Sequence, residues 1–162
     1  MRKRMSIRPI VVGILSLGAA ACSQVPSTAS VTVPPIPAGE ARVWFYRNGG
    51  PYDGVGTPYI RMNDAIVAIS EPNGASYRDV PGGPYHITVD SYGKDFGQDK
   101  NVKVAPGQEL YVKIVSLRDW IAGGGGAENG SGDYARDTFY VWLIPPEIAR
   151  ADMAHSPFYG GG

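Results

Sequence analysis

The sequence predicts an all-β fold: an antiparallel β-sandwich of about seven or eight short strands with a short C-terminal helix. Turn-forming residues are abundant, with 22 glycines and 14 prolines among 162 residues, and they come with ten tyrosines. Short β-branched and aromatic segments recur about every ten residues, and no helical period separates them. Because 43% of the residues are apolar and 19% charged, the chain can form a packed core.

The first half of the expected sandwich begins with residues 41–47, where Val43 and Phe45 fall on one face of a strand. Arg42, Trp44 and Tyr46 fall on the other face. Three more expected strands cover residues 59–62, 65–69 and 76–80, and Asn63-Asp64 forms a tight turn between the first two.

The second half contains an alternating strand over 85–92 and two strands, 101–104 and 109–117, joined at Pro106-Gly107. A long glycine-rich loop is expected over 118–136, followed by an apolar, central strand over 137–145. Two prolines then open a helix over about 147–154, and residues 155–162 are expected to form a flexible tail. The expected folded domain is therefore 40–154.

The N-terminal 21 residues have the layout of a secretory signal peptide. Residues 1–8 are basic, and residues 9–21 are apolar, end in small side chains and are too short to span a bilayer. Ala19 and Ala21 suit ordinary signal peptidase. The segment also resembles a lipobox, with cleavage between Ala21 and Cys22 and acylation of the Cys22 sulfur. Cys22, the single cysteine, directly precedes a polar, proline-rich segment, which favours the lipobox over a free thiol or an uncleaved anchor.

Residues 22–39 would then comprise the lipidated cysteine and a tether, since 23–39 hold four prolines and no charge. Fully extended, this segment could hold a domain up to roughly 50 Å from a membrane. Ser23 is similar to the residues that sort lipoproteins to the outer membrane. The expected location is the outer membrane, facing the periplasm, with the lipid as the link to the membrane.

Four segments resemble an uncharacterised family of bacterial lipoproteins that is defined only as a domain of unknown function. They are residues 44–47, 62–65, 77–86 and 105–114, within a region of about 40–145. The resemblance implies a small β-sandwich similar to PEGA-type envelope modules and assigns no activity. The glycine-rich loop over 123–132 is longer than the family pattern.

The sequence favours a non-enzymatic binding or structural module over an enzyme. Outside the basic N-terminus acidic residues are in excess, which argues against nucleic-acid binding. The two histidines, His86 and His155, are not spaced to form a metal or catalytic site, so neither a metal nor a cofactor is expected.

The 118–136 loop is the first candidate for contact with a partner, either an envelope protein or a glycan. Its candidate binding residues are Trp120, Glu128, Asp133 and Tyr134. The alternative function is an envelope hydrolase or a calcium-dependent enzyme that uses the carboxylates of this loop. Trp44 and Trp142 are instead expected to be covered, because both faces of their sheet would be packed.

Overall fold

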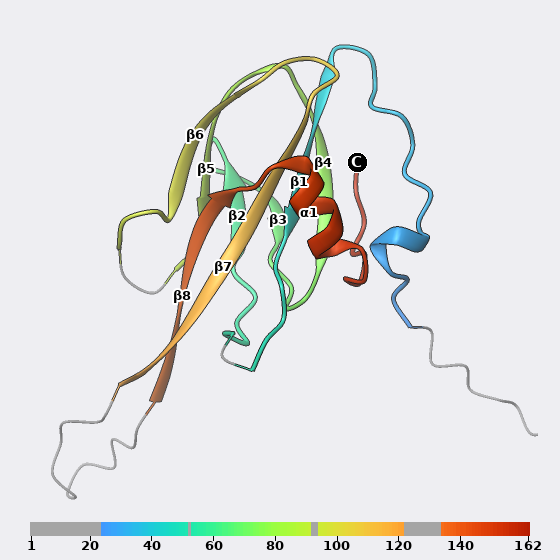
Figure 1. Ribbon diagram of the computed structural model, residues 1–162. Helices are drawn as coiled ribbons and strands as arrows, with labels where there is room; N and C mark the ends of the chain where they lie inside the picture. Colours follow the sequence, from blue (N-terminus) through green and yellow to red (C-terminus); the bar gives the residue numbers. More distant parts are fainter. Residues whose placement is uncertain (1–23, 52, 92–93, 122–133) are drawn as a thin grey trace, which may run out of the picture.

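The computed structural model describes residues 24–51, 53–91, 94–121 and 134–162, with only the backbone described for 118–121 and 134–136. These residues form two packed β-sheets and one short C-terminal helix (Figure 1). The strands are β1 (Glu40–Tyr46), β2 (Tyr59–Met62), β3 (Ala65–Ile69), β4 (Ala75–Pro81), β5 (Gly83–Val89), β6 (Asp99–Val104), β7 (Glu109–Ile121) and β8 (Tyr134–Leu143). A single 3-10 turn, η1 (Thr28–Ser30), precedes them, and the helix α1 (Pro146–Met153) follows.

The fold is the all-β sandwich that the sequence predicts. One sheet has the order β4-β1-β7-β8 and the other has the order β3-β2-β5-β6. All pairings are antiparallel except that of β1 with β7, which is parallel. This parallel pair was not expected. It forms because the chain crosses to the other sheet after β4 and returns from β6 to the far side of β1.

Most expected strand limits agree closely with the structure. The strand expected over 85–92 is β5, which ends at Val89, and the strand expected to be central is β8, which lies at the edge of its sheet. The long loop also differs. Residues 118–121 continue β7, and residues 134–136 begin β8, so the expected loop over 118–136 is too long at both ends. The two strands pair as far as Ile121 with Tyr134. A two-stranded ladder satisfies the backbone N–H and C=O groups that a loop would leave to solvent.

The main core lies between the two sheets. Val43 and Phe45 of β1 pack there with Ile87 of β5 and Val112 of β7, and all four side chains are buried. This confirms the inward face that the alternation in β1 predicts.

A second core covers the outer face of the β1 sheet and is largely aromatic. Trp44 stacks parallel to Tyr111 with ring centroids 6.4 Å apart and packs against Tyr77 and Phe158. Met153 of α1 belongs to the same cluster. Because β1 is buried on both faces, Trp44 is covered as expected. Trp142, in contrast, is 52% exposed, since α1 does not extend over the end of β8.

The two terminal segments are packed against each other and against this sheet. Ser27 and Pro157 form an isolated antiparallel bridge, and the Phe158 N–H donates to the Pro26 carbonyl at 2.8 Å. The expected free tether and flexible tail are therefore corrected: residues 26–34 and 156–160 are docked (Figure 1). Backbone hydrogen bonds in both segments provide an order that proline-rich and glycine-rich composition alone does not reveal. Within the described residues, no helix has the length and apolarity needed to cross a bilayer.

Candidate functional site: a groove between two sheet edges

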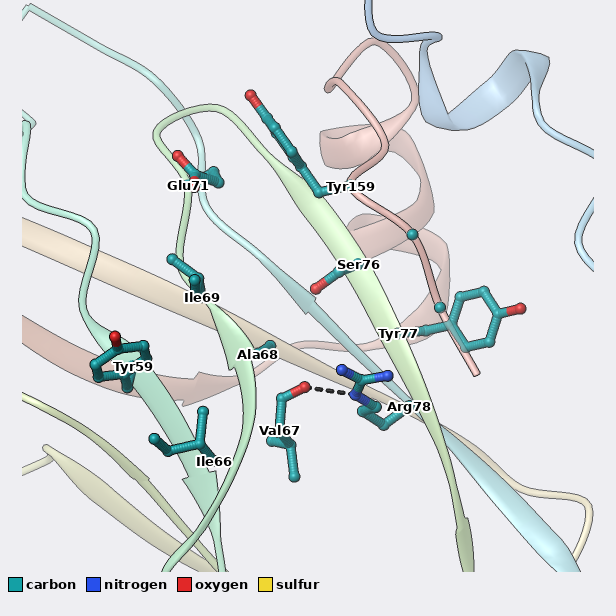
Figure 2. Close-up of a pocket in the computed structure, with 12 residues that line it drawn as sticks. Tyr59, Ile66, Val67, Ala68, Ile69, Glu71, Ser76, Tyr77, Arg78 and Tyr159 are labelled. Carbon is teal, nitrogen blue, oxygen red and sulfur yellow. Dashed lines mark hydrogen bonds between the residues drawn. The ribbon is translucent and has the colours of Figure 1, made fainter.

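A groove of about 450 Å³ opens where the edge of one sheet meets the edge of the other. One wall is β3, the outer strand of its sheet, and the other is β4 with the C-terminal segment beside it (Figure 2). Strands at a sheet edge retain unpaired backbone groups and commonly bind further chain. The groove is lined by Tyr59, Ile66, Val67, Ala68, Ile69, Glu71, Ser76, Tyr77, Arg78, Tyr159, Gly160 and Gly161.

The β3 wall is apolar and exposed. Its sequence, AIVAI, contains no charge and no proline. Ile66 is 52% exposed and Ile69 is 46% exposed, and Tyr59 of β2 is exposed beside them. Natural edge strands usually carry a charged residue or proline that discourages pairing with another chain. The β3 edge lacks that protection, so its composition is suited to contact with a partner.

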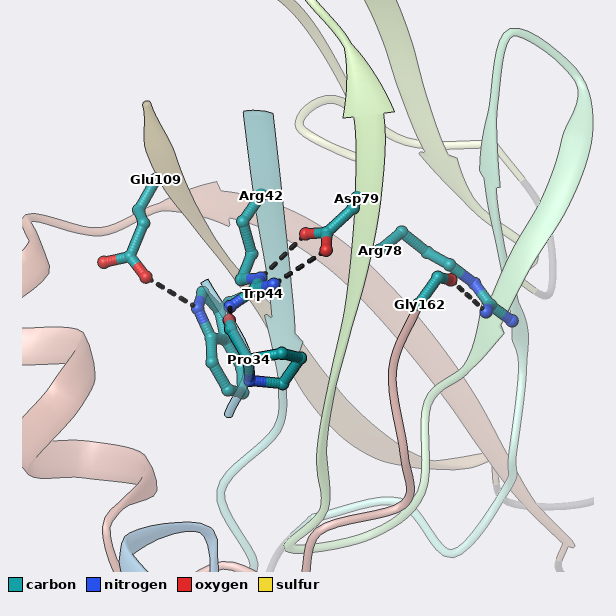
Figure 3. Close-up of polar contacts among 7 residues, drawn as sticks. All are labelled: Pro34, Arg42, Trp44, Arg78, Asp79, Glu109 and Gly162. Carbon is teal, nitrogen blue, oxygen red and sulfur yellow. Dashed lines mark hydrogen bonds and ion pairs between the residues drawn. The ribbon is translucent and has the colours of Figure 1, made fainter. Parts of the chain in front are cut away.

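The two walls are joined by Arg78 of β4. On β3, Ile66 and Ala68 lie opposite consecutive β2 residues, which leaves Val67 as the extra residue of a β-bulge. The Val67 carbonyl accepts a hydrogen bond from Arg78 Nε, and Arg78 also donates to the Gly162 carbonyl (Figures 2 and 3). The bulge thus positions one β3 carbonyl for contact with the other sheet, and Arg78 links the two walls of the groove.

The C-terminal segment forms the upper part of the second wall. It runs parallel to β4: Ala75 N–H donates to the Pro157 carbonyl at 2.9 Å, and Tyr77 N–H to the Gly160 carbonyl at 3.2 Å. Gly160 adopts a φ of +103°, and a Cβ on Gly161 would overlap the Tyr77 ring, so both positions require glycine. The chain's own segment therefore already adds to the β4 edge as an extended strand would.

The buried side chain of Arg47, directly after β1, is bonded to two other segments of the chain. Its Nη1 donates to the carbonyls of Gly56 at 2.7 Å and Ser70 at 3.2 Å, and its Nη2 donates to the Gly54 carbonyl. Burial lowers the pKa of Arg47, while the nearby charge of Asp53 opposes that shift. These bonds tie β1 to the 54–56 segment and to Ser70, which directly precedes Glu71 of the groove.

A buried ion pair supports the outer face of the same sheet. Arg42 Nε and Nη2 each donate to the Asp79 carboxylate at 2.7 Å, and Arg42 Nη1 donates to the Pro34 carbonyl at 2.8 Å (Figure 3). Its guanidinium also lies 4.1 Å from the centroid of the Tyr77 ring. The hydrogen bond to Asp79 raises the pKa of Arg42, although burial opposes this shift. Arg42 therefore connects β1, β4 and the N-terminal segment.

A smaller hollow of about 260 Å³ lies between η1, α1 and the start of β7. Tyr111 Oη donates to Glu109 at 2.6 Å, and Arg150 Nε donates to Tyr111 Oη at 2.8 Å. Burial, with the hydrogen bond to Glu109, raises the pKa of Tyr111 to about 12. Because these three polar groups bond mainly to one another, they serve to hold α1 on the sheet.

The residues predicted as partner-binding do not form a described site. Trp120 pairs with Ala135 and Tyr134 with Ile121 in the β7–β8 ladder, so both lie on strands rather than in a loop. Glu128 and Asp133, like Ala21 and Cys22, lie outside the described residues. His86, on β5, contacts Asp99 of β6 at 3.0 Å, and His155, which follows α1, is exposed. Among the residues described, no three or more His, Cys, Asp or Glu side chains are grouped to hold a metal ion.

Sequence analysis missed the groove. Its lining comes from β2, β3, β4 and the C-terminal segment, which only the tertiary fold brings together. One signal was available: β3 is a short apolar run without a charge, whereas β6 carries charged residues. An uncharged strand at a sheet edge would have indicated a contact surface.

Comparison with protein-family models, with curated proteins and with solved structures gives no match to this chain.

Proposed function

We propose that this chain is a lipid-anchored lipoprotein of the bacterial cell envelope that binds, without catalysis, an extended segment of another envelope protein. The anchor is the acylated Cys22, exposed after cleavage behind Ala21. The binding surface is the groove between β3 and the C-terminal segment. Binding by a tethered module requires only confinement to a membrane and one accessible surface.

The observation that carries this proposal is the exposed, uncharged edge of β3. An extended polypeptide is the occupant that fits it, because the facing β4 edge is already occupied by an extended segment of this chain. Ile66, Ile69 and Tyr59 favour apolar side chains of a protein over a sugar, which would need more polar groups per ring. Arg78 and Glu71 supply charge at the border of the groove.

The anchor is tested by metabolic labelling. Radiolabelled palmitate is expected to be incorporated into the wild-type protein and not into Cys22→Ala, which should leave the membrane fraction. Incorporation that persists in Cys22→Ala, or an unchanged membrane fraction, would contradict the anchor.

The groove is tested by photo-crosslinking in cells, with a benzophenone amino acid placed at Ile69 or, as a control, at Phe96. Both side chains are exposed, and Phe96 lies outside the groove. The Ile69 position is expected to give a protein adduct in which one recurring peptide is found by mass spectrometry. The Phe96 position is expected to give none of it.

A second pair of variants tests whether the Ile69 adduct depends on the β3 edge. Ile66→Lys is expected to abolish the Ile69 adduct by placing a charge on the edge, while Leu117→Lys, at an equally exposed position outside the groove, should leave it intact. An adduct that resists protease and is removed by glycan hydrolases would identify a glycan and overturn the proposal, as would equal loss in both variants.

A further inference from the structure

We infer that the free tether between the lipid anchor and the domain is short and runs only from Cys22 to Pro26. The domain then lies directly on the lipid headgroups, with its η1 end toward the membrane. This inference rests on the proposed anchor at Cys22 and extends it. With a long tether, or stalk, the domain could lie far from the membrane and rotate freely. With a short tether, both its distance from the membrane and its orientation are restricted.

The chain is fixed to the domain within a few residues of Cys22. The Phe158 N–H donates to the Pro26 carbonyl at 2.8 Å, Thr28 N–H donates to the Ser156 carbonyl at 2.8 Å, and Ala29 N–H donates to the Ala154 carbonyl at 3.0 Å. The Thr28 hydroxyl adds a second bond to Ser156. This short ladder ties residues 26–29 to the end of α1 and to the C-terminal segment.

The docking continues toward β1. Val33 packs against the aromatic core around Trp44. The Pro34 carbonyl accepts from Arg42, a side chain that is almost fully buried. Chain between Pro26 and Pro34 is therefore part of the domain and adds nothing to the reach of the tether.

The free length follows from covalent geometry. Four residue steps separate Cys22 from Pro26, and a chain extends at most about 3.5 Å per residue, so the docked segment begins within ~14 Å of the lipidated sulfur's residue. A free tether through Gly39 would instead reach roughly 50 Å. Because the tether to Pro26 is so short, the side of the domain opposite η1 cannot readily turn toward the membrane.

The η1 end is therefore the membrane-facing surface, and its partner is the headgroup layer of the bilayer. Figure 1 places η1 and β6 at opposite sides of the molecule, so β6 is remote from the lipid. Tyr159, at the groove, directly follows the residue bonded to Pro26. The groove thus opens close to the membrane, where the segment it binds must also be found.

The test measures the distance between bilayer and protein by neutron reflectometry. Residues 22–162 are coupled through the Cys22 thiol, the single cysteine, to a maleimide phospholipid in a supported phosphatidylcholine bilayer. One variant carries twelve Gly-Ser residues between Ser23 and Gln24. The matched control carries the same twelve residues between Pro35 and Ile36, beyond the docked segment.

Wild type is expected to show a water gap of no more than ~14 Å between headgroups and protein. The Ser23/Gln24 insertion should widen it by on the order of 10–20 Å, and the Pro35/Ile36 insertion should leave it unchanged. A free tether as far as Gly39 predicts that both insertions widen the water gap equally and that the wild-type gap is already wide. Either result would contradict the short tether. A gap that neither insertion widens would also contradict the inference, since the length of the tether would then not determine the distance between membrane and protein. Chemical coupling separates this result from acylation in cells, which palmitate labelling alone decides.

Discussion

Arg42 and Arg47 lie near the two ends of β1 and are both almost fully buried, yet each does a different structural task. Arg42 is paired with a carboxylate, whereas Arg47 is satisfied mostly by backbone carbonyls. A buried charge without partners is strongly unfavourable, so these contacts are conditions for the fold rather than additions to it.

The first prediction concerns the Arg42–Asp79 pair, whose side chains are 3% and 8% exposed. Asp79→Ala leaves the buried guanidinium without its carboxylate and is expected to lower the free energy of unfolding by about 3–5 kcal/mol. The matched control is Asp90→Ala, which removes the pair of Arg61 and Asp90 at 32% and 45% exposure and should cost less than about 1 kcal/mol. Urea unfolding measures both. If both variants lost the same free energy of unfolding, burial would not account for the contribution of the Arg42–Asp79 pair to stability.

The second prediction concerns Gly161. A methyl group there would overlap the Tyr77 ring, so Gly161→Ala is expected to displace the end of the C-terminal segment from β4. The Tyr77 amide, which donates to Gly160, should then exchange with solvent deuterium at least tenfold faster. Gly83→Ala is the control, because nothing lies within 4 Å of its added Cβ. Unchanged exchange at Tyr77 in Gly161→Ala would mean that the segment tolerates the methyl group.

At the scale of elements, α1 is held on the sheet by charges as well as by Ala149 and Met153. Lys113 Nζ donates to Asp152 at 2.8 Å, and this bond lowers the pKa of Asp152. For Glu109, burial would raise the pKa, but hydrogen bonds from Tyr111, Arg150 and Trp44 together lower it. Both carboxyl groups therefore stabilise the folded state only while they are ionised.

The third prediction is a loss of stability in acid. Because both folded-state pKa values are lowered, this contribution is present above the ordinary values of 3.8 and 4.5 and is lost as the pH falls through the lower folded values. The urea midpoint is expected to fall between pH 5 and pH 3. The double variant Glu109→Gln/Asp152→Asn should be less stable at pH 7 and lose less on acidification. An identical fall in wild type and variant would place the acid sensitivity elsewhere.

The limits of most elements could be predicted from sequence, because strands such as Tyr59–Met62 and Ala65–Ile69 are marked by local apolar runs and turn residues. The docking of residues 26–29 could not, since this segment shows no hydrophobic periodicity and its partners, residues 154–158, lie more than a hundred residues away. The groove was missed for the same reason: its walls come from strands that only the packing of the two sheets brings together.

At the scale of the whole molecule, the sandwich depends on a third layer. α1 and the two terminal segments cover the aromatic outer face of the β4-β1-β7-β8 sheet, whereas β3 and its groove stay accessible. The parallel pairing of β1 with β7 could not be read from sequence either, because the order of strands in a sheet is set by distant contacts.

The fourth prediction tests this third layer. Deleting residues 145–162 uncovers Trp44, Tyr77 and Tyr111, and is expected to produce a protein that binds the dye ANS and unfolds without a cooperative transition. Deleting only 160–162 keeps Phe158 and α1, and should preserve cooperative thermal unfolding. A cooperative, dye-free fold after the larger deletion would show that the two sheets suffice.

The burial of β1 on both faces also determines when the protein can finish folding. β1 is among the first parts of the domain to be synthesised, but its outer face is covered by α1 and Phe158, which are among the last. A domain synthesised from its N-terminal end therefore cannot complete its aromatic core until α1 and Phe158 have emerged from the ribosome. Folding during synthesis is therefore expected to finish only when these last elements are free to pack on β1.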